Sequence, residues 1–121
     1  KIKNIKLPVS APFHCELMRK ATMKMENLIN DQELKDPKIK VVSNVTAEVY
    51  QNVDEIKKLL IKQIESPVRW RETIQHMIDQ GTNTFVEIGP GKVLSGLIKR
   101  INKEVKVLNI DTLEDIQEIN L

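Results

Sequence analysis

The sequence predicts an incomplete α/β fold, with a partial parallel sheet and flanking helices. Short runs rich in β-branched residues, at 39–45, 84–88 and 105–110, alternate with stretches whose apolar residues recur every three or four positions. The order strand, two helices, strand, helix, strand, helix is typical of parallel crossovers. Because three parallel strands leave two edges and much apolar surface uncovered, we expect part of a larger α/β unit.

Apolar periodicity and terminal residues predict the helices. An irregular segment with two prolines ends at Cys15, and the predicted helices cover about 16–30, 52–65, 69–80 and 92–101. Asn52 and Glu55 resemble a capping box at the start of the second helix. A last short helix follows the third strand, and we expect Asp111 and Glu114 to cap it.

Composition excludes several classes of function. The 121 residues suit one small domain, and 19 Lys and Arg against 17 Asp and Glu give a net charge of only +2. With 3% aromatic residues, the chain is a poor candidate for binding nucleic acid. No apolar run approaches the roughly 18 residues of a membrane span.

The single cysteine, Cys15, excludes an internal disulfide framework and a multi-cysteine zinc site. It also favours a reducing compartment, so we expect a cytoplasmic protein. The chain has only two histidines, without clustered carboxylates, so we predict no metal site.

The segment Gly89-Pro90-Gly91-Lys92 joins a predicted strand to a predicted helix. Anions bind at such helix N-termini through free backbone N–H groups. The spacing fits neither the Walker loop nor G-x-G-x-x-G, because Gly96 comes too late and Val93 follows the lysine. A structural strand-to-helix turn is the favoured interpretation, and an anion site is the alternative.

His14 lies in the irregular segment just before the first helix. A histidine there can act as a general base if a nucleophile and an orienting acceptor are within reach. Adjacent side chains rarely face each other, so Cys15 is a poor partner. None of the serines lies in a G-x-S-x-G turn. The residues alone therefore leave both a catalytic and a structural histidine open.

Four segments follow one another along the chain, at residues 8–18 (PVSAPFHCELM), 41–45 (VVSNV), 66–70 (SPVRW) and 86–94 (VEIGPGKVL). Taken together and in this order, they resemble the C-terminal part of bacterial malonyl-CoA:acyl carrier protein transacylases. The resemblance implies a hydrolase-like large subdomain beside a small ferredoxin-like one. Residues 1–121 would form the C-terminal portion of the large subdomain, with residues 1–8 as the connection from the missing small one.

The resemblance also implies a chemistry. Family members move the malonyl group from malonyl-CoA to acyl carrier protein in fatty acid biosynthesis, through a Ser–His acyl-enzyme and without a cofactor. His14 would be the base, oriented by the main-chain carbonyl of Gln63. The family's nucleophile motif, G-H-S-x-G, does not occur in this sequence, so the isolated chain is expected to be inactive.

Substrate and carrier contacts follow from the same resemblance. Phe13 would crowd the α-carbon of the acyl group, although it could equally be a hydrophobic anchor of its loop. Lys3, Lys99 and Arg100 would dock the acidic carrier, although Lys99 and Arg100 also suit a helix C-terminus without any partner. A non-catalytic α/β module that docks an acidic carrier protein is the alternative function. Uncovered apolar surface leads us to expect self-association.

Overall fold

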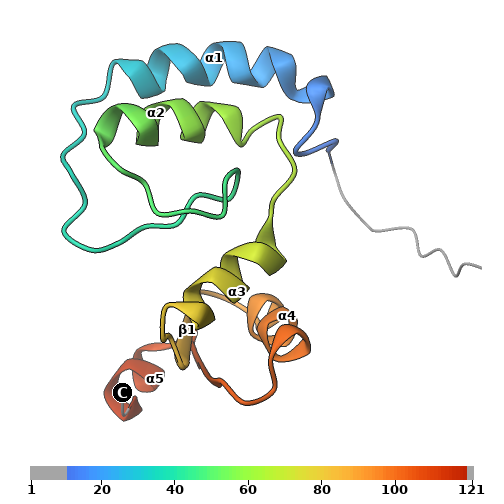
Figure 1. The fold of residues 1–121 in the computed structure, drawn as a ribbon, viewed down its shortest axis with the longest axis vertical. Coiled ribbons are helices and arrows are strands. Elements are labelled where there is room, and N and C mark those ends of the chain that lie inside the picture. The colour runs from blue at the N-terminus through green and yellow to red at the C-terminus, as the bar shows by residue number, and fades with distance from the viewer. Residues whose placement is uncertain (1–10, 120–121) are drawn as a thin grey trace, which may run out of the picture. The chain divides into compact units, whose positions relative to one another are not determined.

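The structure, a computed structural model, describes residues 11–119 of the chain (Figure 1). It divides the chain into two compact units, Lys1–Arg69 and Trp70–Leu121. The predicted connection over residues 1–8 and the predicted docking residue Lys3 lie outside the described residues.

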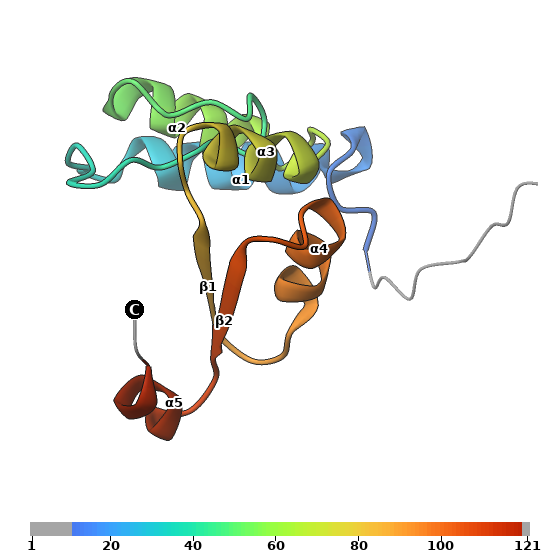
Figure 2. The same ribbon diagram turned by 60° about the horizontal axis from the view of Figure 1, so that its bottom comes forward.

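Two helices dominate the first unit. A short 3-10 turn, η1 (Glu16–Met18), leads into α1 (Arg19–Asn30), and α2 (Val53–Lys62) lies beside α1 in both views (Figures 1 and 2). The Lys57 ammonium of α2 donates to the main-chain carbonyl of Asn30 at 2.8 Å, which places a positive charge at the negative end of α1.

The predicted capping box at the start of α2 forms only in part. As predicted, Asn52 is the N-cap, and its Oδ1 accepts a hydrogen bond from the Glu55 N–H at 2.9 Å, which satisfies one of the backbone donors that a helix N-terminus leaves free. Glu55 Oε2 accepts from the N–H of Gln51 at 2.7 Å, whereas a capping box needs the N–H of the N-cap residue itself.

The predicted strand over 39–45 is wrong. This segment turns back on itself in a tight hairpin with one antiparallel bridge, between Val42 and Val49. The buried Ser43 explains the reversal, because its hydroxyl accepts from the N–H groups of Val45 and Thr46 at 3.1 and 3.4 Å. Ser and Asn favour such local bonds over a ladder, and this preference overrides the β-branched neighbours.

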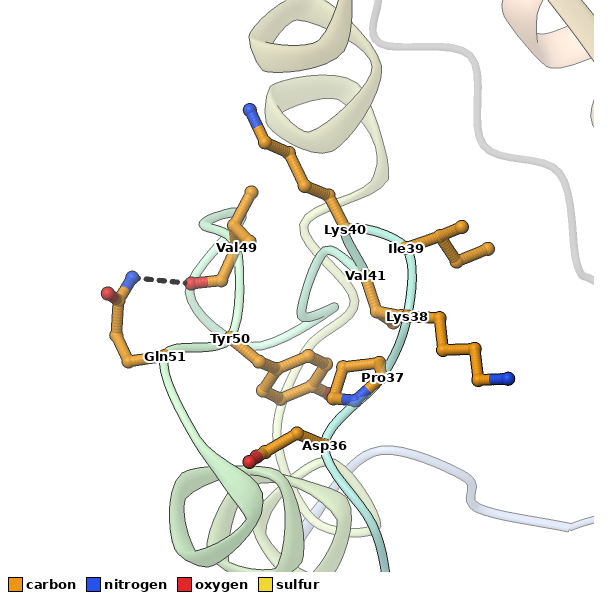
Figure 3. A pocket seen from close by; sticks show the side chains of 9 residues that line it. All are labelled: Asp36, Pro37, Lys38, Ile39, Lys40, Val41, Val49, Tyr50 and Gln51. Carbon is orange, nitrogen blue, oxygen red and sulfur yellow. Dashed lines mark hydrogen bonds between the residues drawn. The ribbon is translucent and has the colours of Figure 1, made fainter.

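The segment that leads into this hairpin lines a pocket together with the hairpin's two ends, at residues 36–41 and 49–51 (Figure 3). The Gln51 side-chain amide donates to the main-chain carbonyl of Val49 at 2.9 Å, the bond drawn in Figure 3. The main chains of Tyr50 and Val41 are joined by a further bond, from N–H to carbonyl, at 3.0 Å. On the other side of the bridge the Ser43 N–H donates to the Glu48 carbonyl at 2.9 Å, so main-chain bonds join the two arms on both sides of it.

The second unit is a small α/β arrangement. It comprises α3 (Trp70–Asp79), β1 (Thr84–Ile88), α4 (Val93–Ile101), β2 (Lys106–Ile110) and α5 (Leu113–Glu118). β1 and β2 are parallel, in register from Thr84 opposite Lys106 to Ile88 opposite Ile110, and lie side by side in Figure 2. The predicted α/β class with a partial parallel sheet and flanking helices is confirmed, but among the described residues the sheet has two strands rather than three.

Aliphatic side chains and one phenylalanine form the core of the second unit. Ile74 of α3, Phe85 of β1, Ile98 of α4 and Val105 are buried together. The helix before β1 and the crossover helix between β1 and β2 thus contribute to one cluster, which fixes α3 and α4 against the strands.

The predicted cap of the last helix is displaced by one residue. The Thr112 hydroxyl accepts from the Asp115 N–H at 3.2 Å, and Asp115 Oδ2 accepts from the Thr112 N–H at 2.8 Å. Asp111 contributes only its N–H, to the same carboxylate at 2.9 Å. The Thr hydroxyl and the Asp carboxylate satisfy each other's backbone donors, whereas the predicted pair, Asp111 and Glu114, does not form this box.

Candidate functional site

His14 occupies the turn that precedes η1, and its side chain is exposed. Its φ of +61° lies in the left-handed region, which is uncommon for a residue with a Cβ. Such backbone conformations concentrate at functional sites, where the surrounding structure maintains them. The Cys15 thiol donates to the carbonyl of Pro12 at 3.2 Å, a bond within the same loop.

The His14 ring contacts one main-chain carbonyl. Nδ1 of His14 lies 2.8 Å from the carbonyl oxygen of Gln63, so the predicted geometry of these two residues is confirmed. A carbonyl only accepts hydrogen bonds, so Nδ1 must carry the proton in this contact. The neutral ring then presents Nε2 with a free lone pair, the form that a general base needs.

Helix α2 provides this acceptor because of where it ends. Gln63 is the residue that follows its last turn, and the Gln63 N–H still donates to Leu59 at 2.9 Å. The last carbonyls of a helix have no partner within the helix, and they carry its partial negative charge. The carbonyl of Gln63 is therefore available to a donor from the His14 loop.

The hairpin at 41–50 holds the segment that carries this carbonyl. Asn44 Nδ2 donates to the Gln63 side-chain oxygen at 3.2 Å, and the Asn44 carbonyl accepts from the Arg69 N–H at 2.9 Å. Arg69 Nη1 also donates to the Thr46 carbonyl at 2.9 Å. Asn44 was not among the predicted site residues, although it lies in the VVSNV segment that supported the resemblance.

The remaining predicted site residues are spread over the two units. Phe13, next to His14 in sequence, is 58% exposed. Lys99 and Arg100 are exposed at the end of α4 in the second unit. Lys99 Nζ donates to the carbonyls of Val105 and Lys103 at 2.5 and 3.3 Å, both in the connection that follows α4.

A carboxylate of the chain itself, from Glu87, binds to the N–H groups that follow the glycine turn. Gly89 and Gly91 have φ of +130° and +90°, which favour glycine. The Glu87 carboxylate then accepts from the N–H groups of Leu94 and Ser95 and from the Ser95 hydroxyl, at 3.0, 2.7 and 2.5 Å. The Ser95 hydroxyl and these two N–H groups lower the pKa of Glu87. Because a carboxylate of the chain fills this position, the structural interpretation of the turn is favoured over an external anion.

Two features are absent from residues 11–119, a cluster of metal ligands and a membrane-spanning helix. No three His, Cys, Asp or Glu side chains of this part of the chain lie where they could hold a metal ion. None of its helices is long and apolar enough to cross a membrane.

Individual proteins resemble this chain over most of its length, whereas no protein-family model matches it. A malonyl CoA-acyl carrier protein transacylase of Bacillus subtilis (strain 168) is 45% identical over 113 residues, which make up 93% of this chain and 36% of the relative. The Staphylococcus aureus (strain COL) protein of that name is 46% identical over 114 residues, 94% of this chain and 37% of the relative. The chain therefore spans little more than a third of these relatives.

Comparison with solved structures leads to the same group of proteins. The malonyl CoA-acyl carrier protein transacylase of Clostridium perfringens superposes with a TM-score of 0.86 at 46% identity, over 94% of this chain and 36% of that one. A malonyl-transacylase in complex with a type II PKS acyl-carrier protein superposes with a TM-score of 0.84 at 38% identity, over 92% and 36%. The chain belongs to the malonyl-CoA:acyl carrier protein transacylase family and corresponds to the C-terminal part of its members.

Proposed function

We propose that the protein containing this chain transfers the malonyl group from malonyl-CoA to the thiol of acyl carrier protein, as a step of fatty acid biosynthesis. The contact of His14 Nδ1 with the Gln63 carbonyl at 2.8 Å carries this proposal. It gives the exposed His14 ring one defined tautomer, which a general base requires and a surface histidine does not. The family of the chain supplies the substrate class.

His14 is the general base of this mechanism. Its Nε2 takes the proton of a serine hydroxyl, contributed by a part of the protein outside this chain, as the serine oxygen attacks the thioester carbonyl of malonyl-CoA. The tetrahedral intermediate then collapses and the bond to sulfur breaks. The imidazolium returns the proton to the departing CoA thiolate, which leaves a malonyl ester on the serine.

The second half-reaction reverses the first. Nε2 takes the proton of the carrier's thiol as its sulfur attacks the malonyl ester, and the imidazolium then protonates the departing serine oxygen. Nδ1 donates to the Gln63 carbonyl throughout. That carbonyl lies just after the last turn of α2, where the helix dipole stabilises the positive charge that the ring carries in each half-reaction. No cofactor is needed.

Further contacts belong to the same proposal. Phe13, which is exposed and adjacent to the base, limits the space at the α-carbon of the acyl group. Arg100 and Lys99, together with Lys3, attract the acidic carrier. A neighbouring solved structure holds an acyl-carrier protein with its transacylase, which supports a docking surface in this protein as well.

We also assign residues 1–121 to the C-terminal portion of the large subdomain, with residues 1–8 as the connection from the small one. A cytoplasmic location fits the single cysteine and the proposed reaction.

Replacing the base tests this function. In the full-length protein, His14→Ala should lower malonyl transfer by on the order of 10³-fold or more, as in Ser–His units generally. The matched control is His76→Ala, which removes the second of the two histidines, located in α3, and should leave transfer nearly unchanged. Full activity of His14→Ala would refute the base role.

The same experiment separates the alternative of a carrier-docking module. A full-length wild-type protein that binds acyl carrier protein but forms no malonyl ester from malonyl-CoA would favour the module. Formation of the ester, detected by mass spectrometry of the intact protein, would favour the transferase.

A further inference from the structure

One residue of the hairpin, Asn44, contacts both ends of the segment between α2 and α3, and Arg69 Nη1 makes a further bond to the Thr46 carbonyl at 2.9 Å. Asn44 donates through its side chain to Gln63 Oε1 at 3.2 Å and accepts through its carbonyl from the Arg69 N–H at 2.9 Å. Gln63 begins this segment and Arg69 ends it, directly before α3. Asn44 thus contacts both ends of the segment between α2 and α3, one through its side chain and the other through its main-chain carbonyl.

Buried residues and main-chain bonds hold the hairpin around Asn44 in place. Ser43, next to Asn44, is fully buried, and its N–H donates to the Glu48 carbonyl at 2.9 Å. Ala47 is also buried and has a φ of +61°, which fixes the reversal of the chain. The main chain at Asn44 is therefore held on both sides, and its half-buried amide is fixed against the Gln63 side chain.

We propose that Asn44 is a positioning residue for the proposed transfer reaction. By holding the Gln63 amide, it fixes the peptide whose carbonyl accepts the His14 Nδ1 proton. The peptide that carries this carbonyl lies beyond the last turn of α2, where the Ile64 N–H donates to the Ile61 carbonyl at 3.2 Å. A residue at a helix end has fewer helical bonds than one in its interior, and the Asn44 side chain adds a restraint at Gln63.

This inference rests on the proposed function for its kinetic consequences but not for its structural one. The structural consequence is the tautomer of the His14 ring. With the Gln63 carbonyl in place, the proton stays on Nδ1, and when the carbonyl turns away the ring is free to carry it on Nε2. A ring with its proton on Nε2 cannot accept the proton of a nucleophile there.

The test uses side-chain variants that leave the acceptor carbonyl chemically intact. Asn44→Ala and Gln63→Leu each remove the bond between the two side chains, whereas the main-chain bonds of both residues remain available. Gln63→Glu is the conservative variant, because its carboxylate still accepts from the Asn44 amide. Thr46→Ala is the matched control, since it removes the Thr46 hydroxyl that accepts from the Glu48 N–H within the same hairpin and leaves Gln63 untouched.

Two measurements on the full-length protein are read together. In ¹⁵N-resolved NMR spectra of the His14 ring, wild type, Gln63→Glu and Thr46→Ala should show the Nδ1-protonated tautomer, and Asn44→Ala and Gln63→Leu a mixture of tautomers. In malonyl transfer, those two variants should lose about 3- to 10-fold in kcat, the scale of one net hydrogen bond. The KM for malonyl-CoA should not change, because ground-state binding is unaffected. The double variant should be no worse than either single variant.

Each outcome decides one point. An unchanged His14 tautomer in Asn44→Ala and Gln63→Leu overturns the positioning role, as does a Gln63→Glu variant that behaves like Gln63→Leu. If wild type transfers no malonyl group, the proposed function fails, and the NMR comparison still decides whether Asn44 controls the His14 ring. Should Asn44→Ala not fold, the Gln63→Leu and Gln63→Glu pair gives the same decision.

Discussion

Two adjacent cations at the end of α4 should separate docking from stability. Lys99 donates to the carbonyls of Val105 and Lys103, whereas Arg100 is exposed beside it. Neutralising either residue removes one positive charge from the same surface. Only Lys99→Gln also removes the ammonium that closes the connection between α4 and β2, so the two variants differ in one physical respect.

The expected loss of stability follows from that contact. A hydrogen bond to a charged group contributes about 1.5–3 kcal/mol. The bond to Val105 is partly buried, so we take the lower limit, about 1.5 kcal/mol. That corresponds to about a tenfold change in the unfolding equilibrium. Arg100→Gln should stay within about 0.5 kcal/mol of wild type, as exposed substitutions generally do.

The assays are urea unfolding and the two half-reactions in the full-length protein. Both neutral variants should raise the KM for the carrier by a similar factor, and the reversal Lys99→Glu, Arg100→Glu should raise it further. The wild-type carrier step should weaken with added salt, because the Debye length is about 10 Å at 0.1 M. Under the proposed mechanism, ester formation from malonyl-CoA should be nearly unchanged, since that half-reaction involves no docking of the carrier protein.

Three results would refute this reasoning in different places. An unchanged carrier KM in the double reversal removes Lys99 and Arg100 from the docking surface. Equal losses in both half-reactions indicate damage to the fold instead of lost docking. Equal unfolding free energies for Lys99→Gln and Arg100→Gln show that the bonds from the Lys99 ammonium do not stabilise the protein.

Three further predictions concern selectivity, acid stability and association. Phe13→Ser in the full-length protein should improve the use of methylmalonyl-CoA relative to malonyl-CoA by about 10-fold, and an unchanged ratio would exclude a role in selectivity. The pKa of Glu87 is lowered in the folded chain, so its contribution to stability is complete above the ordinary value of 4.5 and is lost as the pH falls through the lowered pKa. Glu87→Gln should therefore reduce the loss of stability that acid causes, measured by urea unfolding at several pH values. An identical pH dependence in the variant and wild type would contradict this. The isolated chain exposes Leu17, Ile39, Ile88 and Val93, each by at least 72%, and should associate in sedimentation experiments; a monomer at high concentration would contradict the prediction.

Much of the second unit could be predicted from the sequence because local signals and packing agree there. The runs at 84–88 and 105–110 become parallel partners, and the periodic stretch between them becomes the crossover helix whose Ile98 reaches the core. The helix ends at Asn52 and Gly81 were also marked by residues that favour such positions. Where burial, propensity and termination point to one structure, a single sequence is sufficient.

The hairpin could not be predicted in this way. Its run of β-branched residues satisfies the pattern of a strand, but a strand also needs a partner, and pairing is not encoded in the run itself. The signals that decided the structure were Ser43 and Asn44, which the predicted strand over 39–45 included. Their side chains bond to the main chain at Val45 and to the Gln63 amide.

The site was predicted only in part, for a related reason. Resemblance connected His14 with the Gln63 carbonyl, although the two are 49 residues apart. Periodicity could not do so, because the acceptor is a main-chain atom and any residue type carries one. What selects this carbonyl is its place after the last turn of α2 and the restraint from Asn44. A base oriented by a carboxylate can be sought in the sequence as a residue, whereas a base oriented by a carbonyl depends on where a helix stops. Substitutions that shift the end of α2 should therefore affect the His14 ring even when they leave every predicted catalytic residue in place.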